Sequence, residues 1–254
     1  MPELYRSRNV LWQLVAQQLI LRYRRTALGY LWTLINPLVM MSIMAWVFSA
    51  LFNAEIKSFT VFLFAGMIPW TFFSAVTIQS GTSFINNEGL IKKIYLPKFI
   101  FPLSIAFALL IDSALSFLSL FVIILILGGK LSLSLLFLPL AFTLLFFFTL
   151  GIALIMAVAT VFFRDLQHVI LIAMQGLFFL TPIVYKKAAI DGWIAWLVGF
   201  NPMTPFIELF RAPLTQAILP DNNIIFHCSV ISLVSFVVGF SIFLYQERNI
   251  VFRL

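Results

Sequence analysis

The stretch RYRRTALGYLWTLINP, residues 22–37, decides how this chain is organised. Its first half holds three arginines, Arg22, Arg24 and Arg25, and an unbroken apolar run begins within five residues of Arg25. A guanidinium group is costly in hydrocarbon, so this boundary is typical of a helix on a membrane surface that turns into a helix crossing the bilayer. The stretch therefore predicts the level of the lipid phosphates and marks the cytoplasmic side.

The composition excludes a water-soluble domain. The chain has 254 residues, of which 63% are hydrophobic and only 10% charged, and 30 are phenylalanines. Soluble domains carry about 25% charged residues. The net charge of +7 would suggest nucleic-acid binding in a soluble protein, but the excess of Lys and Arg in cytoplasmic loops explains it here. We expect an all-α, polytopic membrane protein with no nucleic-acid partner.

Residues 4–25 predict an amphipathic helix in the plane of the membrane interface. An apolar and aromatic face recurs at helical spacing, and Leu14 and Ile20 blur the opposite, polar face. The alternative is the frayed start of the first span, and the arginine cluster favours the interface helix. The apolar face consists of Trp12, Val15, Ala16, Leu19 and Tyr23.

Residues 30–245 predict six membrane spans within a single domain, 1–254. A stretch of about 20 apolar residues suffices to cross a bilayer. Pro139 is expected to divide a surface entry from the fourth span proper, and residues 246–254 form a basic tail. Two segments before the last span, 193–200 and 204–219, are too short to cross and predict short helices at the outer side. The expected spans are 30–52, 59–84, 99–127, 131–163, 168–185 and 224–245.

The basic residues test this topology. Six crossings place both termini on one side, and eleven of the sixteen Lys and Arg residues then lie on the side expected to be cytoplasmic. This asymmetry favours cytoplasmic termini. The other five are Lys57, Lys130, Lys186, Lys187 and Arg211.

Motifs for nucleotide and metal chemistry are missing from the sequence. No G-x-x-x-x-G-K-[ST] occurs, and Gly128-Gly129-Lys130-Leu131 lacks both the preceding glycine and the following hydroxyl. His168 and His227 lie far apart, and no Cys/His cluster exists. We expect no metal site, no bound cofactor and no ATPase activity on this chain.

Two acidic positions leave alternatives open. Asp165 and His168 could form a catalytic pair, but an aspartate at the start of a helix is more often a cap, which we favour. Asp112 lies deep in a span, where a carboxylate can serve as a proton or ion site. Pairing with a neighbouring span or a second subunit is the preferred reading of Asp112, because carriers usually hold several such groups.

The aromatic residues also have two interpretations. Phe146-Phe147-Phe148 and Phe178-Phe179 could face lipid, and Trp70, Tyr95, Tyr185, Trp193 and Trp196 lie at expected interfaces. Together they could instead line a route for sugar rings, whose C–H faces stack on aromatic rings. Composition does not choose between the two.

Four stretches in register resemble the permease subunit of type-2 ABC polysaccharide exporters, closest to the O-antigen and teichoic-acid branch. They cover essentially the whole chain in order. The stretches are RYRRTALGYLWTLINPL at 22–38, GLIKKIYLPKFIFPLS at 89–104, FFRDLQHV at 162–169 with FFLTPIVY at 178–185, and NPMTPFIELFR at 201–211.

The resemblance implies an exporter built from two copies of the chain and two ATPase subunits, which bind ATP and Mg²⁺. Such an exporter moves a lipid-linked polysaccharide across the bacterial inner membrane to its outer face. The rival hypotheses are a proton-coupled lipid-sugar flippase and a membrane transferase that uses polyprenyl phosphate.

The resemblance also implies roles for individual residues. Arg22, Arg24 and Arg25 would hold the lipid phosphate of the substrate, or anchor the helix to membrane lipid by the same chemistry. A coupling helix would dock on the ATPase through Asn87, Glu88, Gly89, Lys92, Lys93 and Tyr95; its alternative is a plain basic loop. The glycan would enter between spans one and five and pass Phe146, Phe147, Phe178, Phe179 and Tyr185. An outer gate would comprise Trp193, Trp196, Asn201 and Pro202.

Overall fold

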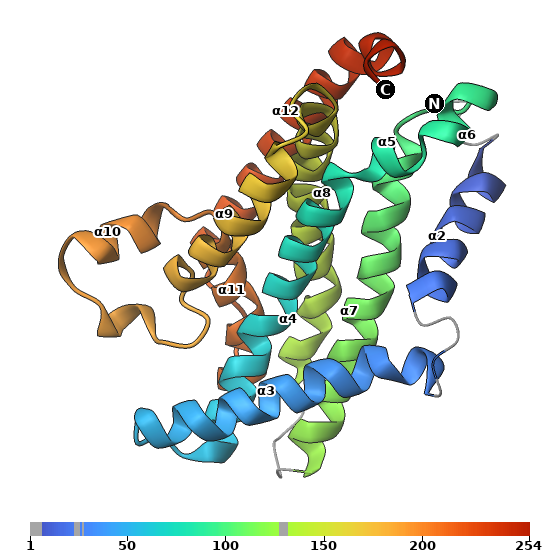
Figure 1. The fold of residues 1–254 in the computed structure, drawn as a ribbon. Coiled ribbons are helices and arrows are strands. Elements are labelled where there is room, and N and C mark those ends of the chain that lie inside the picture. The colour runs from blue at the N-terminus through green and yellow to red at the C-terminus, as the bar shows by residue number, and fades with distance from the viewer. Residues whose placement is uncertain (1–6, 23–25, 27, 127–131) are drawn as a thin grey trace.

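A computed structural model of the chain describes residues 7–22, 26, 28–126 and 132–254. These residues form helices joined by turns, with no strand among them (Figure 1). The prediction of an all-helical protein is thus confirmed. The helices are α2 (Arg8–Arg22), α3 (Trp32–Leu51), α4 (Ile56–Gly81), α5 (Ser83–Asn86), α6 (Glu88–Lys93), α7 (Ile100–Ile126), α8 (Leu138–Phe162), α9 (Leu166–Leu180), α10 (Gly192–Phe200), α11 (Met203–Arg211) and α12 (Asn222–Arg253).

Five helices in the described ranges are long and apolar enough to cross a membrane: α3, α4, α7, α8 with the turn before it, and α12. The turn is Leu133–Phe137, and Pro139 lies in the first turn of α8, as the sequence predicted. The expected fifth span is shorter. At 15 residues α9 reaches about 22 Å, less than the ~30 Å of hydrocarbon.

Helices α8 and α12 form the tightest pair in the bundle. Their backbones meet at Gly151 and Gly239, where a Cβ on either residue would overlap the facing helix. Two serines of α12 reinforce the crossing: Ser235 Oγ donates to the carbonyl of Phe148 at 2.8 Å, and Ser232 Oγ donates to that of Leu144 at 2.7 Å. Small residues and interhelical hydrogen bonds are what membrane helices use to pack, since lipid gives them no hydrophobic drive to associate.

The two predicted short helices before the last span are present, and their environments differ. Helix α11 packs against α4, α8 and α12, and its Phe206 stacks on Phe148 of α8 with ring centres 5.0 Å apart. Phe148 in turn stacks on Phe73 of α4 at 5.4 Å. Helix α10 projects away from the bundle (Figure 1), with Trp193 and Phe200 largely exposed.

The first two helices are arranged differently from the sequence prediction. Helix α2 runs beside α7 and buries Leu11, Leu14 and Val15 (Figure 1). Leu14, assigned to the polar side, is therefore part of the buried face, while Ala16 is exposed. Helix α3 lies crosswise to the long helices and contacts α4 and α7. The contact with α7 decides which face of α2 is buried, and this contact cannot be predicted from the periodicity of α2 alone.

Helix ends that carry basic residues lie at one end of the bundle: Arg8 begins α2, Lys92 and Lys93 lie in α6, and Arg253 ends α12. The start of α2, the short helices α5 and α6, and the end of α12 lie together there (Figure 1). The guanidinium of Arg253 lies 5.7 Å from the centre of the Phe162 ring, which brings the ends of α12 and α8 together. The residues predicted as a tail, 246–254, continue α12 as far as Arg253.

Candidate functional site

A groove of about 490 Å³ runs between α4 and α9. Its α4 wall is one helical face, because Trp70, Ser74 and Ile78 are spaced four residues apart. The other wall comes from α9 and is mostly apolar, with one amide. It consists of Leu171, Met174, Gln175, Phe178 and Phe179. We call this hollow the α4–α9 groove.

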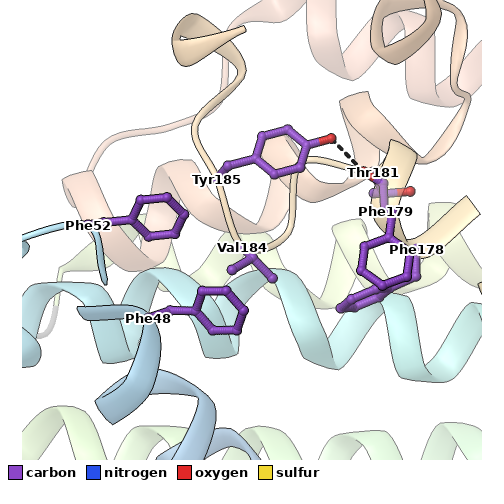
Figure 2. A pocket seen from close by; sticks show the side chains of 7 residues that line it. All are labelled: Phe48, Phe52, Phe178, Phe179, Thr181, Val184 and Tyr185. Atoms are coloured by element: carbon purple, nitrogen blue, oxygen red, sulfur yellow. Dashed lines mark hydrogen bonds between the residues drawn. The ribbon is translucent and has the colours of Figure 1, made fainter. Parts of the chain in front are cut away.

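A second, smaller hollow of about 160 Å³ adjoins the groove (Figure 2). It lies where the end of α3, the end of α9 and the segment after α9 meet, and we call it the aromatic pocket. The hydroxyl of Tyr185 donates a 2.9 Å hydrogen bond to the carbonyl of Phe179, which folds the segment back onto α9. The pocket is lined by Phe48, Phe52, Phe178, Phe179, Thr181, Val184 and Tyr185.

Two phenylalanines belong to both hollows and join them. The ring of Phe178 lies 5.9 Å from Trp70 and 5.4 Å from Phe179, both at steep interplanar angles. Phe179 is 74% exposed, so its ring is available to a ligand. Aromatic faces with a few polar groups, here Ser74 and Gln175, can stack on and orient a sugar ring. Ser74 and Ile78 were not predicted from the sequence; their spacing at intervals of four residues from Trp70 is the signal that could have identified the α4 wall.

Three of the five predicted channel aromatics come together in these hollows: Phe178, Phe179 and Tyr185. The other two lie elsewhere. Phe146 packs on Phe107 with ring centres 5.1 Å apart, and Phe147 packs on Phe236 of α12 at 5.3 Å. Adjacent helix residues point in directions about 100° apart, so a pair in sequence is not a pair in space.

The predicted outer-gate residues divide between two helices. Trp193 and Trp196 are exposed on α10, and Trp196 packs on Phe200 at 4.4 Å. Asn201 is buried at the start of α11, where its Oδ1 accepts a 2.9 Å hydrogen bond from the Met203 amide. Its Nδ2 donates to Thr181 Oγ1 at 2.8 Å and ties α11 to the aromatic pocket. Pro202 is exposed beside it.

Arg211 was counted among the outer charges, yet the structure buries it to 8% exposure. Its guanidinium donates to the carbonyls of Pro182 and Ile183, and its plane covers the Phe62 ring at 3.5 Å. Burial lowers the pKa of Arg211 to about 9, with Glu208 opposing the shift, so the side chain stays charged at neutral pH. The burial of Arg211 could not be predicted from the sequence, because its acceptors are backbone carbonyls almost thirty residues away.

The predicted coupling helix corresponds to α6, which buries none of its residues. Asn87 precedes it and its Nδ2 donates to the Ser83 carbonyl at 2.8 Å. Lys92 Nζ lies 2.6 Å from Glu88 Oε1 and, by donating to it, holds the pKa of that carboxyl below its usual value. Gly89 and Lys93 are exposed on α6, and Tyr95, after its end, is 86% exposed. Leu90 and Ile91 of α6 pack against the core, while its charged side remains exposed among the described residues.

The structure does not describe the side chains of the arginines that are proposed to bind a lipid phosphate. Helix α2 ends at Arg22, and the side chains of Arg22, Arg24 and Arg25 lie outside the described residues. Asp165 takes the N-cap position of α9, but its side chain makes no capping hydrogen bond there, so the favoured capping role is not seen; both it and His168 are exposed. Asp112 is 9% exposed in α7 and already interacts within the chain.

A metal site was not expected from the sequence. In the part of the chain that the structure describes, no three His, Cys, Asp or Glu side chains come close enough to hold a metal ion.

Comparison with known proteins places this arrangement in a family. Residues 9–215 match the family model described as ABC-2 type transporter. An O-antigen export system permease protein RfbA of Klebsiella pneumoniae is 30% identical, over 89% of this chain and 88% of the relative. The protein of the same name in Myxococcus xanthus is 29% identical over 95% and 94%. The polysialic acid transport protein KpsM of Escherichia coli is 24% identical over 89% of each chain. The chain therefore belongs to the ABC-2 type transporter family of membrane proteins.

Proposed function

We propose that this chain is the permease subunit of an ATP-driven exporter of a lipid-linked polysaccharide of the O-antigen kind. The observation that carries the proposal is the match, at about 30% identity and over nearly the full length, to relatives named O-antigen export system permease. The four stretches that carry the resemblance all lie within residues 9–215, which match the family model. An export role also suits a multi-span chain with an exposed aromatic groove.

The substrate route follows the α4–α9 groove and the aromatic pocket. The pocket is lined by α3 and α9, which supports lateral entry of a membrane-bound lipid between these helices. Sugar units stack on the exposed ring of Phe179 and on Phe178 beside it, while the buried Trp70 supports Phe178 from behind. Contacts of this kind are weak enough for stepwise movement, since a conduit must release what it binds. Arg22, Arg24 and Arg25 hold the lipid phosphate at the cytoplasmic rim.

The driving force comes from a separate ATPase subunit, which binds ATP and Mg²⁺, while this chain binds no cofactor. Helix α6 is the docking element, because it is exposed, carries Lys92 and Lys93, and lies at the basic end of the bundle. Movements of the ATPase on closing around ATP reach the bundle through the short helix α5 and then α4 and α7.

The working assembly contains two copies of the chain and two ATPase subunits in the bacterial inner membrane. Helices α3 and α9 complete six crossings in that assembly, with α2 at the interface and both termini in the cytoplasm. Helix α9 and the non-helical segment after it together provide the length that α9 alone lacks. The exposed rings of Trp193 and Trp196, with Asn201 and Pro202, form the outer gate.

Gene deletion with complementation tests the proposal. A producing strain without this gene should keep its glycan inside and lose it from the surface, and the wild-type gene should restore display. Glycan is measured on intact and on permeabilised cells with the same antibody or lectin. Unchanged surface display in the deletion strain would contradict the proposal.

A further inference from the structure

A buried arginine lies at the end of α11, behind the aromatic pocket. Arg211 Nη1 donates to the carbonyl of Pro182 at 2.5 Å and Nη2 to that of Ile183 at 2.5 Å. A longer contact of 3.4 Å joins Nε to the carbonyl of Phe62 in α4. The guanidinium also stacks on the Phe62 ring. One side chain therefore links α11, α4 and the segment after α9.

The segment held by Arg211 is not helical. Residues 181–185 follow the end of α9, and Thr181, Pro182 and Ile183 are buried while Val184 and Tyr185 line the pocket. Buried carbonyls outside a helix need donors from elsewhere, since leaving them unpaired in an apolar surrounding is costly. A guanidinium supplies several donors in one plane, which a lysine ammonium does not.

Helix α4 leaves room for the guanidinium at Gly66. A Cβ at this position would lie 2.9 Å from Arg211 Nη2 and 3.4 Å from Ile183 Cγ2. The same helix thus provides the gap, the stacking ring and a third acceptor. The surroundings of Arg211 thus fit a guanidinium closely, and the groups that it binds are backbone carbonyls of the same chain.

Helix α11 holds the same segment at its other end as well. Asn201, at the start of α11, donates to Thr181 Oγ1 at 2.8 Å and to the carbonyl of Leu180 at 3.3 Å. Asn201 and Arg211 therefore bracket the segment from the two ends of one nine-residue helix.

We infer that Arg211 is a positioning residue: it fixes residues 181–185 against α4 and α11, and thereby sets the aromatic pocket that the sugar chain must pass. The expected effect of Arg211 on export rests on the proposed function, whereas its effect on the order of residues 181–185 does not. This positioning role implies that the pocket-lining segment stays fixed to α4 and α11 as one unit during export.

The structural consequence is tested by spin labelling. Lys186→Cys, next to the segment and exposed, is labelled in a Cys228→Ala background, with Phe226→Cys on α12 as the matched control site. Arg211→Gln should increase the mobility of the label at 186 and leave that at 226 unchanged. Arg211→Lys should restore part of the order. Equal mobility at 186 with and without Arg211 would overturn the inference, whatever the protein transports.

The transport consequence is tested by replacing the arginine with a covalent link. Arg211→Ala should lower surface polysaccharide roughly tenfold, because a misplaced contact wall slows passage. Removing the guanidinium also frees the space beside Gly66, so Gly66→Cys and Ile183→Cys can form a disulfide there. In the Arg211→Ala, Cys228→Ala background this disulfide should restore export, and a reductant should abolish it again.

The single cysteines in the same background are the controls and should restore nothing. A disulfide that forms without restoring export would overturn the inference, and so would failure of the two cysteines to link. Failure of the wild-type gene to restore export would instead reject the proposed function. The mobility of the spin label at residue 186 would then still test the positioning role of Arg211.

Discussion

A Cβ atom added to Gly239 of α12 would lie 2.8 Å from the Cα of Gly151 in α8. At Gly151 an added Cβ would lie 2.5 Å from Ser235 Oγ and would overlap the Ser235 backbone. These obstacles are mostly backbone, which cannot move aside as a flexible side chain can. The contact fixes how α12, the helix carrying the C-terminal end, sits on the rest of the bundle.

Alanine at Gly151 or Gly239 should therefore force α8 and α12 apart. We expect each substitution to destabilise the protein by about 3 kcal/mol or more, since overpacking at backbone contact has no cheap relaxation. The midpoint of thermal unfolding in detergent, followed by size-exclusion chromatography, measures the effect.

Gly176→Ala on α9 is the matched control for these variants. A Cβ there meets nothing within 4 Å, so the change should be neutral or gain up to about 1 kcal/mol from helix propensity. Loss of stability at Gly176 equal to that at Gly151 would contradict the close-packing explanation.

Asn201→Ala should destabilise the contact between α11 and the segment after α9. The substitution leaves the buried Met203 amide without its acceptor and removes the donor to Thr181, whose hydroxyl still donates to the Leu177 carbonyl; we expect a cost of about 1–3 kcal/mol. A double-mutant cycle with Thr181→Ala measures the coupling in the same unfolding assay. Strictly additive effects would show that the two side chains do not interact.

Phe179→Ala should lower export while leaving the fold intact. The ring is 74% exposed, so little packing is lost, but a stacking face at the junction of both hollows disappears. We expect roughly three- to tenfold less surface polysaccharide. Phe179→Trp should retain export, since it keeps an aromatic face.

Phe226→Ala, on the exposed side of α12, is the control for loss of an exposed ring. Equal loss of export in the Phe226 and Phe179 variants would argue against a special role for the groove.

Charge reversal on α6 should release the ATPase. Lys92→Glu with Lys93→Glu changes an exposed surface without touching the core, so the chain should fold and insert normally. Opposite charge at an interface weakens association strongly, and we expect about tenfold less ATPase to co-purify in mild detergent.

Lys186→Glu with Lys187→Glu, both exposed and distant from α6 in sequence, serves as the matched double charge reversal. Its complex with the ATPase should match the wild type. Undiminished co-purification of the Lys92 and Lys93 variant would remove α6 from the interface.

The order of the helices was largely predictable, because the residues that end a helix act locally in the sequence. Charged and proline-containing breaks predicted the limits of α4, α7 and α8 closely, and Asn201-Pro202 separates α10 from α11 as expected. The resemblance to polysaccharide export permeases was confirmed by the family match together with the relatives of that name. Local signals of this kind need no knowledge of the packing.

Long-range features were not predictable from the sequence. The crosswise course of α3, the buried face of α2 and the burial of Arg211 depend on partners from distant segments. The groove was half predicted: Phe178 and Phe179 were named, but Ser74 and Gln175 on its walls were not. Helical spacing shows which residues share a face, and only tertiary contacts show which helix that face meets.

The central claim is that this chain conducts a lipid-linked polysaccharide but draws its energy from another subunit. Its most direct test is reconstitution of the purified chain in liposomes, with and without its ATPase subunit and MgATP, using the lipid-linked polysaccharide extracted from the producing strain. We expect translocation, measured as glycan that becomes accessible to a glycosidase on the far side, only when the ATPase and MgATP are both present. Sustained translocation by the chain alone would contradict the account.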